Sequence, residues 1–514
     1  MADLFWADSV ARKIVTQHRG SVITLEIGIT PSGPFHVGHL REMIITDAVR
    51  RALARLGAQT QLVYFVDDLD NLRKLYPFLP KSFEQHVGKP ISQIPSPDGS
   101  SQTYADYFLV PFRRALKELG IEVEILYAHD YYTSGKMTTM IDRALEHRDT
   151  IAEILSRVSG RALPDEWQPF EPLDATTGKI RGNKITEVDV KNHRVKYVAS
   201  DNTEKWADYD KGQGKLPWRV DWPARWALNN VAFEPFGKEH AASGGSFDAG
   251  REIITKVYER QPPIYEVYEH IYLAGEAKKM SASLGNLVSI EDFLQVVPPA
   301  VARYFVLRSK NERHLVFDPG LGLMHLTDEF ARLEAKVADG QADAVEKSML
   351  SYSQTSARRA TVEVPFRHLV NVTQAAQGNV EEIKRLLKRT GHGAARANTE
   401  DLKLQIGKVQ QWLKLYAPAE YKFSLSKTPP KLRVSKQEMK VLDSAQKAIE
   451  EGKEGQALHN AIYESGQAAG LKPRETFQVL YHIFLGQDSG PKLGFFLSML
   501  ERNFVLERIG HYLD

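Results

Sequence analysis

The sequence of 514 residues contains no cysteine. Disulfide bonds, thiolate catalysis and every zinc site that needs a cysteine ligand are therefore excluded, and we expect neither zinc nor any other bound metal centre in the protein itself. Long apolar runs are also lacking, since the longest, such as Ile271 to Gly275 and Leu493 to Leu500, fall far short of the roughly 18 residues that cross a bilayer. Residues 1–12 lack the cationic start and apolar core of a secretory signal, so we expect a cytoplasmic protein without a membrane segment.

A strong net charge is lacking as well, because 67 Lys and Arg nearly balance 65 Asp and Glu and leave +2. The charge is nevertheless unevenly distributed: residues 351–440 carry 17 Lys and Arg against 7 Asp and Glu. Such a segment is most often a solvated surface, but it is also typical of a face that binds phosphates. The charge pattern alone does not choose between the two.

Alternating strand and helix patterns dominate the N-terminal part of the chain. Ser21 to Thr30 predicts a buried strand, and the apolar spacing from Val37 to Leu56 predicts a helix that Gly57 ends. Gln61 to Val66 and Val123 to Tyr127 predict further strands, the latter after a helix over Tyr104 to Leu119. Strands that alternate with helices indicate a parallel sheet.

We therefore predict an α/β fold: a Rossmann-like, parallel-sheet nucleotide-binding domain formed by residues 1–77 and 217–320. Proline, glycine and polar clusters interrupt the alternation over residues 78–216, which predicts an inserted domain with a β-hairpin at Ile185 to Val198.

Helical spacing dominates after about Leu321, so we predict an all-α C-terminal region. It divides into a bundle over residues 321–423 and a second helical domain over 424–514. Two segments are predicted joints, Ala360 to Gly378 and Ser424 to Ser435, the second because Pro429-Pro430 cannot continue a helix. The predicted helices lie at Thr327 to Val337, Val380 to Leu387, Asp401 to Leu415 and Met439 to Ile449.

The stretch from Thr30 to His39 follows the first predicted strand, at the position where open parallel sheets bind ligands. A helix N-terminus there attracts phosphate. His36 and His39 are three residues apart and share one face of the first turn, where both imidazoles can donate hydrogen bonds to phosphoryl oxygens. Gly38 has no side chain and would let a flat adenine rest against the backbone. Taken alone, the histidine pair would more often be surface residues or part of a metal site.

A second stretch, from Lys278 to Asn286, combines two cations with hydroxyls and small residues. A loop of this kind can fold over a triphosphate and neutralise charge that develops on the α-phosphate. Without the first stretch, an ordinary solvated loop would be the better interpretation.

Together the two stretches resemble the HIGH and KMSKS motifs of class I aminoacyl-tRNA synthetases, here as His36-Val37-Gly38-His39 and Lys279-Met280-Ser281-Ala282-Ser283. The wider sequence is similar to the class I lysyl-tRNA synthetase family, and the similarity reaches both ends of the chain. The segments that carry it are Thr30-Pro31-Ser32-Gly33, Trp218-Arg219-Val220-Asp221-Trp222-Pro223, Gly237-Lys238-Glu239-His240, Gly244-Gly245-Ser246-Phe247-Asp248, Leu480-Tyr481-His482-Ile483-Phe484-Leu485-Gly486 and Gly490-Pro491-Lys492-Leu493-Gly494.

The resemblance implies roles for individual residues. His36, His39 and Lys279 would be catalytic. ATP would be bound by Pro31, Ser32, Gly33, His36, Gly38, His39, Glu239, Lys279, Met280, Ser281 and Ser283. Lysine would be bound by Gly28, Thr30, Trp218, His240 and Tyr268. Apart from the resemblance, an ammonium group calls for a carboxylate, which Glu26, two residues before Gly28 on the same strand face, could supply, with Asp221 as another candidate.

The sequence departs from the family pattern at two places. The position of the second motif that is usually lysine is Ala282, so the loop cation must be Lys279 or Lys278. Members of the family can carry cysteine zinc clusters in the insertion, and the corresponding region here, about Asp174 to Asn202, has none.

The implied activity is that of a lysine–tRNA ligase whose substrates are L-lysine, ATP with Mg²⁺, and tRNA(Lys); we expect no DNA partner. The insertion would face the acceptor end of the tRNA, and the helical remainder would contact the anticodon, with Trp412, Tyr416 and Tyr421 available for stacking or, equally, for the helix core. Two alternatives stay open: an arginine-specific class I synthetase, and a non-catalytic RNA-binding relative.

Overall fold

A computed structural model of the chain describes residues 4–18, 20–180, 184–275, 288–355, 364–393 and 399–513. The chain forms two compact units. The first comprises residues 1–294, 302–316 and 342–357, and the second comprises residues 295–301, 317–341 and 358–514.

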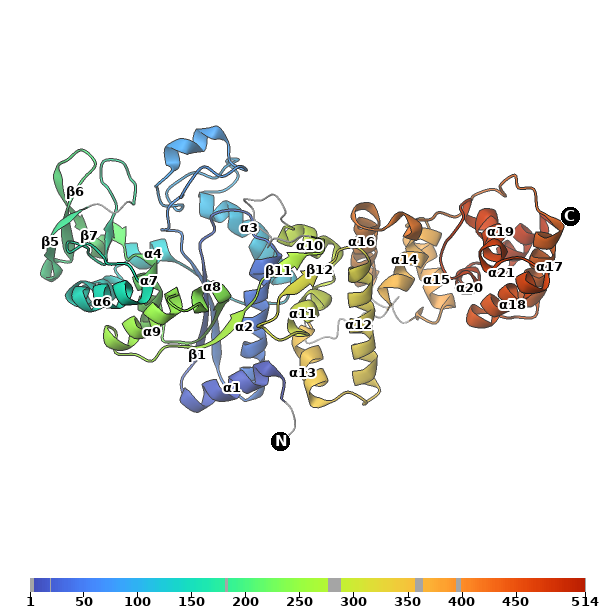
Figure 1. The fold of residues 1–514 in the computed structure, drawn as a ribbon, viewed down its shortest axis with the longest axis horizontal. Helices are drawn as coiled ribbons and strands as arrows, with labels where there is room; N and C mark the ends of the chain where they lie inside the picture. The colour runs from blue at the N-terminus through green and yellow to red at the C-terminus, as the bar shows by residue number, and fades with distance from the viewer. Residues whose placement is uncertain are drawn as a thin grey trace. The chain divides into compact units, whose positions relative to one another are not determined.

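A five-stranded parallel sheet forms the centre of the first unit (Figure 1). Its strand order is β10-β9-β1-β2-β3, so β1 is paired on one side with β2 and on the other with β9. The order in which strands are added to the sheet reverses at β1, and in open parallel sheets such a switch point, at the carboxyl edge, is where ligands bind. The strands are β1 (Ile23–Ile29), β2 (Thr60–Val66), β3 (Glu124–Tyr127), β9 (Val231–Gly237) and β10 (Ile264–Tyr268).

The strands and helices predicted from the N-terminal sequence are confirmed. β1 is followed by the helix α2 (Val37–Arg55), and α3 (Tyr104–Glu118) leads to β3. The first residues of β1 are buried because helices cover the sheet, and α1 (Trp6–Gln17) packs on α2. β3 is a strand of the central sheet although it lies within residues 78–216, the range expected for the insertion.

Between β3 and β9 the chain forms a separate small sheet of three antiparallel strands, β5 (Ile185–Asp189), β6 (Arg194–Val198) and β7 (Glu204–Asp208). The predicted hairpin is therefore confirmed, and a third strand extends it. The helix α7 (Trp218–Leu228) then returns the chain to the central sheet and packs on α9 (Ser246–Lys256). Three helices lie between β3 and β5 in the chain: α4 (Ala128–Thr133), α5 (Thr138–Glu146) and α6 (Arg148–Ser159).

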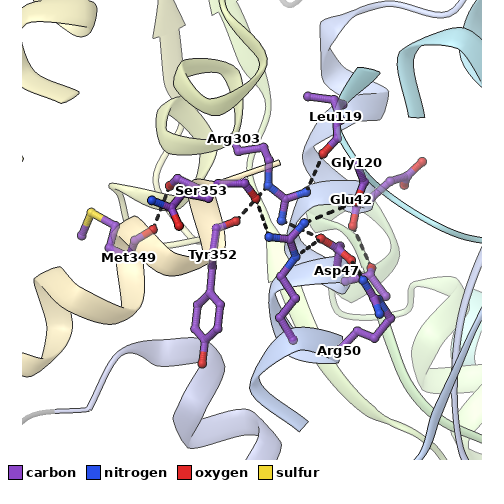
Figure 2. Close-up of polar contacts among 12 residues, drawn as sticks. Glu42, Asp47, Arg50, Leu119, Gly120, Arg303, Met349, Tyr352 and Ser353 are labelled. Atoms are coloured by element: carbon purple, nitrogen blue, oxygen red, sulfur yellow. Dashed lines mark hydrogen bonds and ion pairs between the residues drawn. The ribbon is translucent and has the colours of Figure 1, made fainter. Parts of the chain in front are cut away.

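A buried ion cluster anchors the middle of α2 (Figure 2). The carboxylate of Asp47 lies 2.6 Å from the guanidinium of Arg303 and 2.7 Å from those of both Arg50 and Arg51. Arg303 belongs to α11 (Pro299–Leu307) and also donates to the carbonyl of Tyr352 in α13 (Ala344–Ser353). Burial would raise the pKa of Asp47, but the three cations outweigh it and hold this pKa below its usual value. The cluster thus connects α2 to two helices that come much later in the chain.

The second unit is helical, as predicted. α12 (Leu321–Ala338), α15 (Val380–Arg389), α16 (Thr399–Leu415) and α17 (Lys436–Glu450) contain the four helices predicted there. α18 (Gly455–Ala468), α19 (Pro473–Leu485), α20 (Leu493–Met499) and α21 (Arg502–Gly510) join α17 in a bundle (Figure 1).

One of the two predicted joints is wrong. Residues 366–375 form the helix α14 (Phe366–Ala375), because Phe366, Leu369, Val370 and Thr373 recur at helical spacing and are buried. The other joint, Ser424 to Ser435, is free of helix and strand, and Ser435 then caps α17.

Trp412 is not available for base stacking. Its side chain is fully buried, packs on Phe366 and donates its indole N–H to the carbonyl of Pro319 at 2.8 Å. It belongs to the helix core, whereas Tyr416 and Tyr421 are half-buried.

The remaining elements are short. None of the helices in the described ranges is long and apolar enough to cross a bilayer. The remaining short helices and strands are η1 (Lys81–His86), β4 (Glu171–Pro172), η2 (Val190–Asn192), η3 (Tyr209–Lys211), β8 (Gly214–Lys215), α8 (Lys238–Ala241), β11 (Ile271–Leu273), α10 (Ile290–Val296), β12 (Leu315–Phe317) and η5 (Ala419–Tyr421).

Candidate functional site

A pocket of about 270 Å³ opens at the carboxyl edge of the central sheet, around the start of α2. The ends of β1, β9 and β10 form its base, and α2 and α7 supply its walls. Polar and aromatic side chains dominate the lining. The lining residues are Gly28, His36, Gly38, His39, Glu42, Trp218, Trp222, Arg225, Glu234, Pro235, Phe236, Gly237, Glu239, His240, Tyr268, Glu269, His270 and Ile271.

The two histidines of the first motif form the start of α2. His36 is the N-cap, and its Nδ1 accepts from the backbone N–H of Gly38 at 3.1 Å. The Nδ1 of His39 accepts from the backbone N–H of His36 at 3.0 Å. A neutral imidazole that accepts at Nδ1 carries its proton at Nε2, so these backbone bonds select the same tautomer in both rings. Burial, and then the neighbouring His36, lowers the pKa of His39 well below its usual value, which keeps this ring neutral.

Gly38 gives the His36 ring its position. A Cβ on residue 38 would lie 2.7 Å from Cε1 and 2.8 Å from Nδ1 of His36. The ring can fold back over the first turn only because residue 38 has no side chain. The structure therefore gives Gly38 a role in placing the histidine, in addition to the expected access for adenine.

Glu42 lies three residues after His39 on α2 and lines the pocket. Its Oε2 accepts from the hydroxyl of Tyr268 at 2.6 Å, whereas its buried Oε1 has no hydrogen-bond partner among the described residues. Burial raises the pKa of Glu42 to about 7, even though the Tyr268 bond lowers it. A buried acceptor without a partner costs free energy, and a ligand that donates to it would recover that cost.

Glu234 is the second carboxylate of the pocket, and its bonding differs from that of Glu42. It accepts from the indole N–H of Trp222 at 3.1 Å and from that of Trp226, so both oxygens are engaged. Burial, and then Glu26, raises the pKa of Glu234 to about 8. This carboxylate holds the two indoles of α7 in place.

The aromatic wall is a row of rings. Trp218 stacks on Trp222 with ring centres 4.9 Å apart, and His240 meets the two indoles at 5.6 and 5.5 Å. Trp218 is 36% exposed and forms the outer end of the row. Glu239 lies beside the row and pairs with His270 at 2.5 Å.

Eight of the residues predicted from the sequence come together in this pocket. They are Gly28, His36, Gly38, His39, Trp218, Glu239, His240 and Tyr268.

Other predicted residues do not line the pocket. Glu26 is fully buried, and its Oε2 accepts from Asn229 at 2.7 Å. Asp221 is buried in an ion pair with Arg225 at 2.8 Å. Thr30 donates to Asp70 at 3.3 Å, and the carbonyl of Ser32 accepts from Tyr104 at 2.7 Å. Pro31 and Gly33 are also absent from the lining.

The second motif, with Lys278, Lys279, Met280, Ser281, Ala282 and Ser283, lies outside the described residues.

Sequence reasoning missed Glu42, Glu234 and Arg225. The signals were present: Glu42 continues the three-residue spacing of His36 and His39 along one helix face, and Glu234 is the lone charge in an otherwise apolar strand. Arg225 gave no comparable signal in the sequence. In the folded chain its guanidinium lies beside Gly28, where a Cβ would be 2.9 Å from Nη1 of Arg225.

Comparison with known proteins agrees with this geometry. Residues 4–357 match the family model described as tRNA synthetases class I (K). Lysine--tRNA ligase 1 of Methanosarcina acetivorans is 39% identical, over 98% of this chain and 98% of that protein. Lysine--tRNA ligase of Thermoplasma acidophilum is 36% identical, over 99% of both chains. A glutamate tRNA ligase structure from Elizabethkingia meningosepticum superposes with a TM-score of 0.43 and 12% identity, over 96% of this chain and 99% of that one. The chain belongs to the family of class I (K) tRNA synthetases.

Proposed function

We propose that the protein is a lysine–tRNA ligase. A lysine carboxylate oxygen attacks the α-phosphorus of Mg²⁺-bound ATP, the bond to the leaving diphosphate breaks, and lysyl-adenylate forms. A hydroxyl of the terminal tRNA ribose then attacks the lysyl carbonyl, and AMP leaves. The observation that carries lysine as the substrate is the open acceptor Oε1 of Glu42, which lies in a pocket walled by indoles.

The lysine side chain fits this pocket by its chemistry. Its ammonium group donates to Glu42, whose other oxygen Tyr268 already fixes, and the ionised pair is the strong kind of hydrogen bond. Its aliphatic stem lies along Trp218 and Trp222, which also attract the cation through their ring faces. We therefore assign the ammonium to Glu42, ahead of Glu26 and Asp221, which do not line the pocket.

The start of α2 provides the groups that bind the phosphates of ATP. The Nε2–H groups of His36 and His39 donate to phosphoryl oxygens whose charge grows in the transition state. Both donors are fixed before ATP arrives because the backbone N–H groups hold the rings. Glu239 contacts the ATP ribose, and Lys279, aided by Ser281 and Ser283, neutralises the phosphates. No step requires a covalent intermediate with the enzyme.

The two alternatives are less well supported. Arginine would present a planar guanidinium that calls for a bidentate carboxylate, and one oxygen of Glu42 is already taken by Tyr268. A non-catalytic relative would have no need for two oriented histidine donors beside a carboxylate with an open acceptor. The lysine–tRNA ligases with nearly full-length similarity also favour the lysine-specific enzyme.

Pyrophosphate exchange with each amino acid in turn, with tRNA present, tests the proposal. We expect exchange with lysine to exceed that with arginine by at least 10²-fold, since a buried charged acceptor left wrongly paired costs about 1.5–3 kcal/mol or more. Exchange driven best by arginine, or none with any amino acid, would reject the assignment.

The loop cation can be identified by substitution. Lys279→Ala should slow adenylate formation while lysine affinity stays nearly unchanged, because the charge it stabilises develops in the transition state. Lys278→Ala is the matched control and should be much milder, and Ala282→Lys should bring little gain. A silent Lys279→Ala variant would remove this residue from the mechanism.

We further propose that residues 78–216 include the part that meets the acceptor end of the tRNA and that residues 424–514 contact the anticodon. The basic start of this region supports the second assignment, since residues 424–440 carry 5 Lys and Arg against 1 Glu.

A further inference from the structure

Arg41 of α2 directly precedes Glu42 and is fully buried, yet it does not line the pocket. In the part of the chain that the structure describes, no carboxylate lies within ion-pair distance of its guanidinium. Burial lowers the pKa of Arg41 to about 10, although Tyr268 and Glu269 raise it. A buried cation without a paired carboxylate is costly, so other groups must compensate its charge.

Backbone carbonyls from two loops provide this compensation. Nη1 of Arg41 donates to the carbonyl of Glu269 at 2.5 Å and to that of His270 at 3.4 Å, in the connection between β10 and β11. Nη2 donates to the carbonyls of Asn311 and Arg313 at 2.9 and 2.8 Å, in the connection between α11 and β12. One guanidinium thus fastens both loops to α2.

The first of these loops forms part of the pocket wall. Its residues from Tyr268 to Ile271 line the pocket. Tyr268 stands directly before the fixed carbonyl of Glu269, and its hydroxyl donates to Oε2 of Glu42 at 2.6 Å. Arg41 and Glu42 are also neighbours in the chain. The contact between Tyr268 and Glu42 is therefore part of a closed ring of bonds, and Arg41 forms its other link.

Filling space is a poor explanation for this arginine. An apolar side chain of similar volume would occupy the same position without the cost of burying a cation. It would not, however, hold carbonyls at fixed distances from α2, because it has no donors. The particular property of the guanidinium is its planar set of N–H groups, which can reach several acceptors at once.

We infer that Arg41 is a positioning residue for the choice of amino acid: it holds Tyr268 against Glu42, which keeps one oxygen of Glu42 occupied and the other open. The inference deepens the proposed function, on which it rests for the identity of the ligand as lysine. With one open oxygen, Glu42 suits an ammonium group. If Tyr268 moves away, both oxygens open, and Glu42 becomes a bidentate acceptor that suits a guanidinium.

Pyrophosphate exchange with lysine and with arginine, with tRNA present, tests the inference. In Arg41→Met we expect the KM for lysine to rise about tenfold and the preference for lysine over arginine in kcat/KM to fall about tenfold, the scale of one hydrogen bond to a charged group. The KM for ATP should stay unchanged, because backbone N–H groups of α2 hold His36 and His39. The matched control is Arg50→Met, on the same helix but paired with Asp47, which should change neither preference nor KM.

The pH profile provides a readout that a general loss of stability would not move. The bond from Tyr268 lowers the pKa of Glu42, so its loss should shift the rise of kcat/KM for lysine to higher pH. The phenols of Tyr64 and Tyr268 have pKa values well above the usual range and stay neutral throughout. A lower rate with the midpoint of the wild type would assign Arg41 to the fold alone and overturn the inference.

A double-mutant cycle tests whether Arg41 acts through Tyr268. Tyr268→Phe should produce the same loss of preference, and the combination with Arg41→Met should be little worse than the stronger single change. Additive effects would show that Arg41 acts elsewhere. Arg41→Lys retains the charge but lacks the planar set of donors, so it should show the same changes in weaker form, and it replaces Arg41→Met throughout if that variant does not fold.

A crystal structure of the Arg41 variant separates this inference from the proposed function, because it measures the contact between Tyr268 and Glu42 without any substrate. If exchange is not driven by lysine in the wild type but this contact lengthens in the variant, the proposed function fails and the positioning of Tyr268 stands. If lysine drives exchange but the variant keeps the 2.6 Å contact and the wild-type KM for lysine, the proposed function stands and the role of Arg41 is rejected.

Discussion

Helix α2 carries two buried carboxylates only five residues apart, and their surroundings are opposite. Asp47, in the middle of the helix, contacts three guanidinium groups, and its pKa lies below the usual value (Figure 2). Glu42, nearer the start, has one phenol hydroxyl on one oxygen and no described partner on the other, and its pKa rises to about 7. The protein itself supplies the counter-charges of Asp47, whereas one oxygen of Glu42 has no hydrogen-bond partner among the described residues.

This contrast separates the part of the helix that supports the fold from the part that serves the proposed chemistry. A buried charge whose partners are all supplied by the protein has nothing left to offer a ligand. A buried carboxyl with an open acceptor lies at higher free energy, and a cation from outside can lower it.

Asp47→Ala should destabilise the fold by about 3–5 kcal/mol, because Arg303 would then be a buried cation without its counter-charge. Thermal unfolding and urea unfolding measure the loss. Arg50→Ala is the control, since Arg50 is partly exposed and two other cations would still pair with Asp47. A similar stability for Asp47→Ala and the wild type would show that the cluster contributes nothing to the fold.

His39→Ala should lower lysine-dependent adenylate formation by about 10²–10³-fold, the effect of losing one preorganised donor in the transition state. His36→Ala should behave in the same way. Each change also removes a hydrogen bond to the start of the helix, which costs about 0.5–2 kcal/mol of stability, so circular dichroism must show that the fold is kept. Near-normal exchange rates in a folded variant would contradict the proposed mechanism.

Glu42→Gln should reduce kcat/KM for lysine by roughly 10- to 10²-fold, the value of a hydrogen bond between charged groups. The pH profile gives the sharper test. In the free enzyme Glu42 is mostly protonated below about pH 7 and cannot attract an ammonium group, so kcat/KM for lysine should rise with pH and level off above 7. The glutamine variant should lose this rise. If its pH profile matches that of the wild type, another group causes the titration.

Gly38→Ala should lower activity about tenfold while stability stays the same or increases. Alanine favours a helix by about 1 kcal/mol over glycine, but its Cβ would lie 2.7 Å from Cε1 of His36 and push that ring away. Exchange kinetics and thermal unfolding on the same sample check both parts. A stable variant with full activity would show that the His36 ring need not hold this position.

The sequence was informative where local patterns decide the structure. Alternating strand and helix periods predicted β1, α2 and β2, and the spacing of His36 and His39 predicted a shared face at the start of α2. It was less informative where contacts between distant segments decide. Glu26 looked suitable because it shares a strand face with Gly28, but it is buried outside the pocket lining, and Asn229, far away in the sequence, donates to one of its carboxylate oxygens. Arg225 and Glu234 enter the pocket only because α7 and β9 return to the first strand.

The missed helix α14 has a different cause. Its ten residues are flanked by proline and glycine, and β-branched residues such as Val370 and Val372 weaken the intrinsic helix preference. The helical spacing of its apolar residues is present in the sequence, and their burial against α12 and α16 stabilises the helix.

The row of indoles on α7 has an optical consequence. Three of the seven tryptophans of the protein lie within nine residues: Trp218 stacks on Trp222, Trp226 lies tilted beside Trp222, and Glu234 accepts from the indoles of Trp222 and Trp226. Stacked indoles interact electronically, so their near-ultraviolet circular dichroism depends on how the rings are arranged. In the proposed binding mode, a lysine stem that packs against Trp218 would change the surroundings of the outermost ring. Under that proposal the protein carries its own spectroscopic probe of amino-acid binding, which needs neither ATP nor tRNA to give a signal.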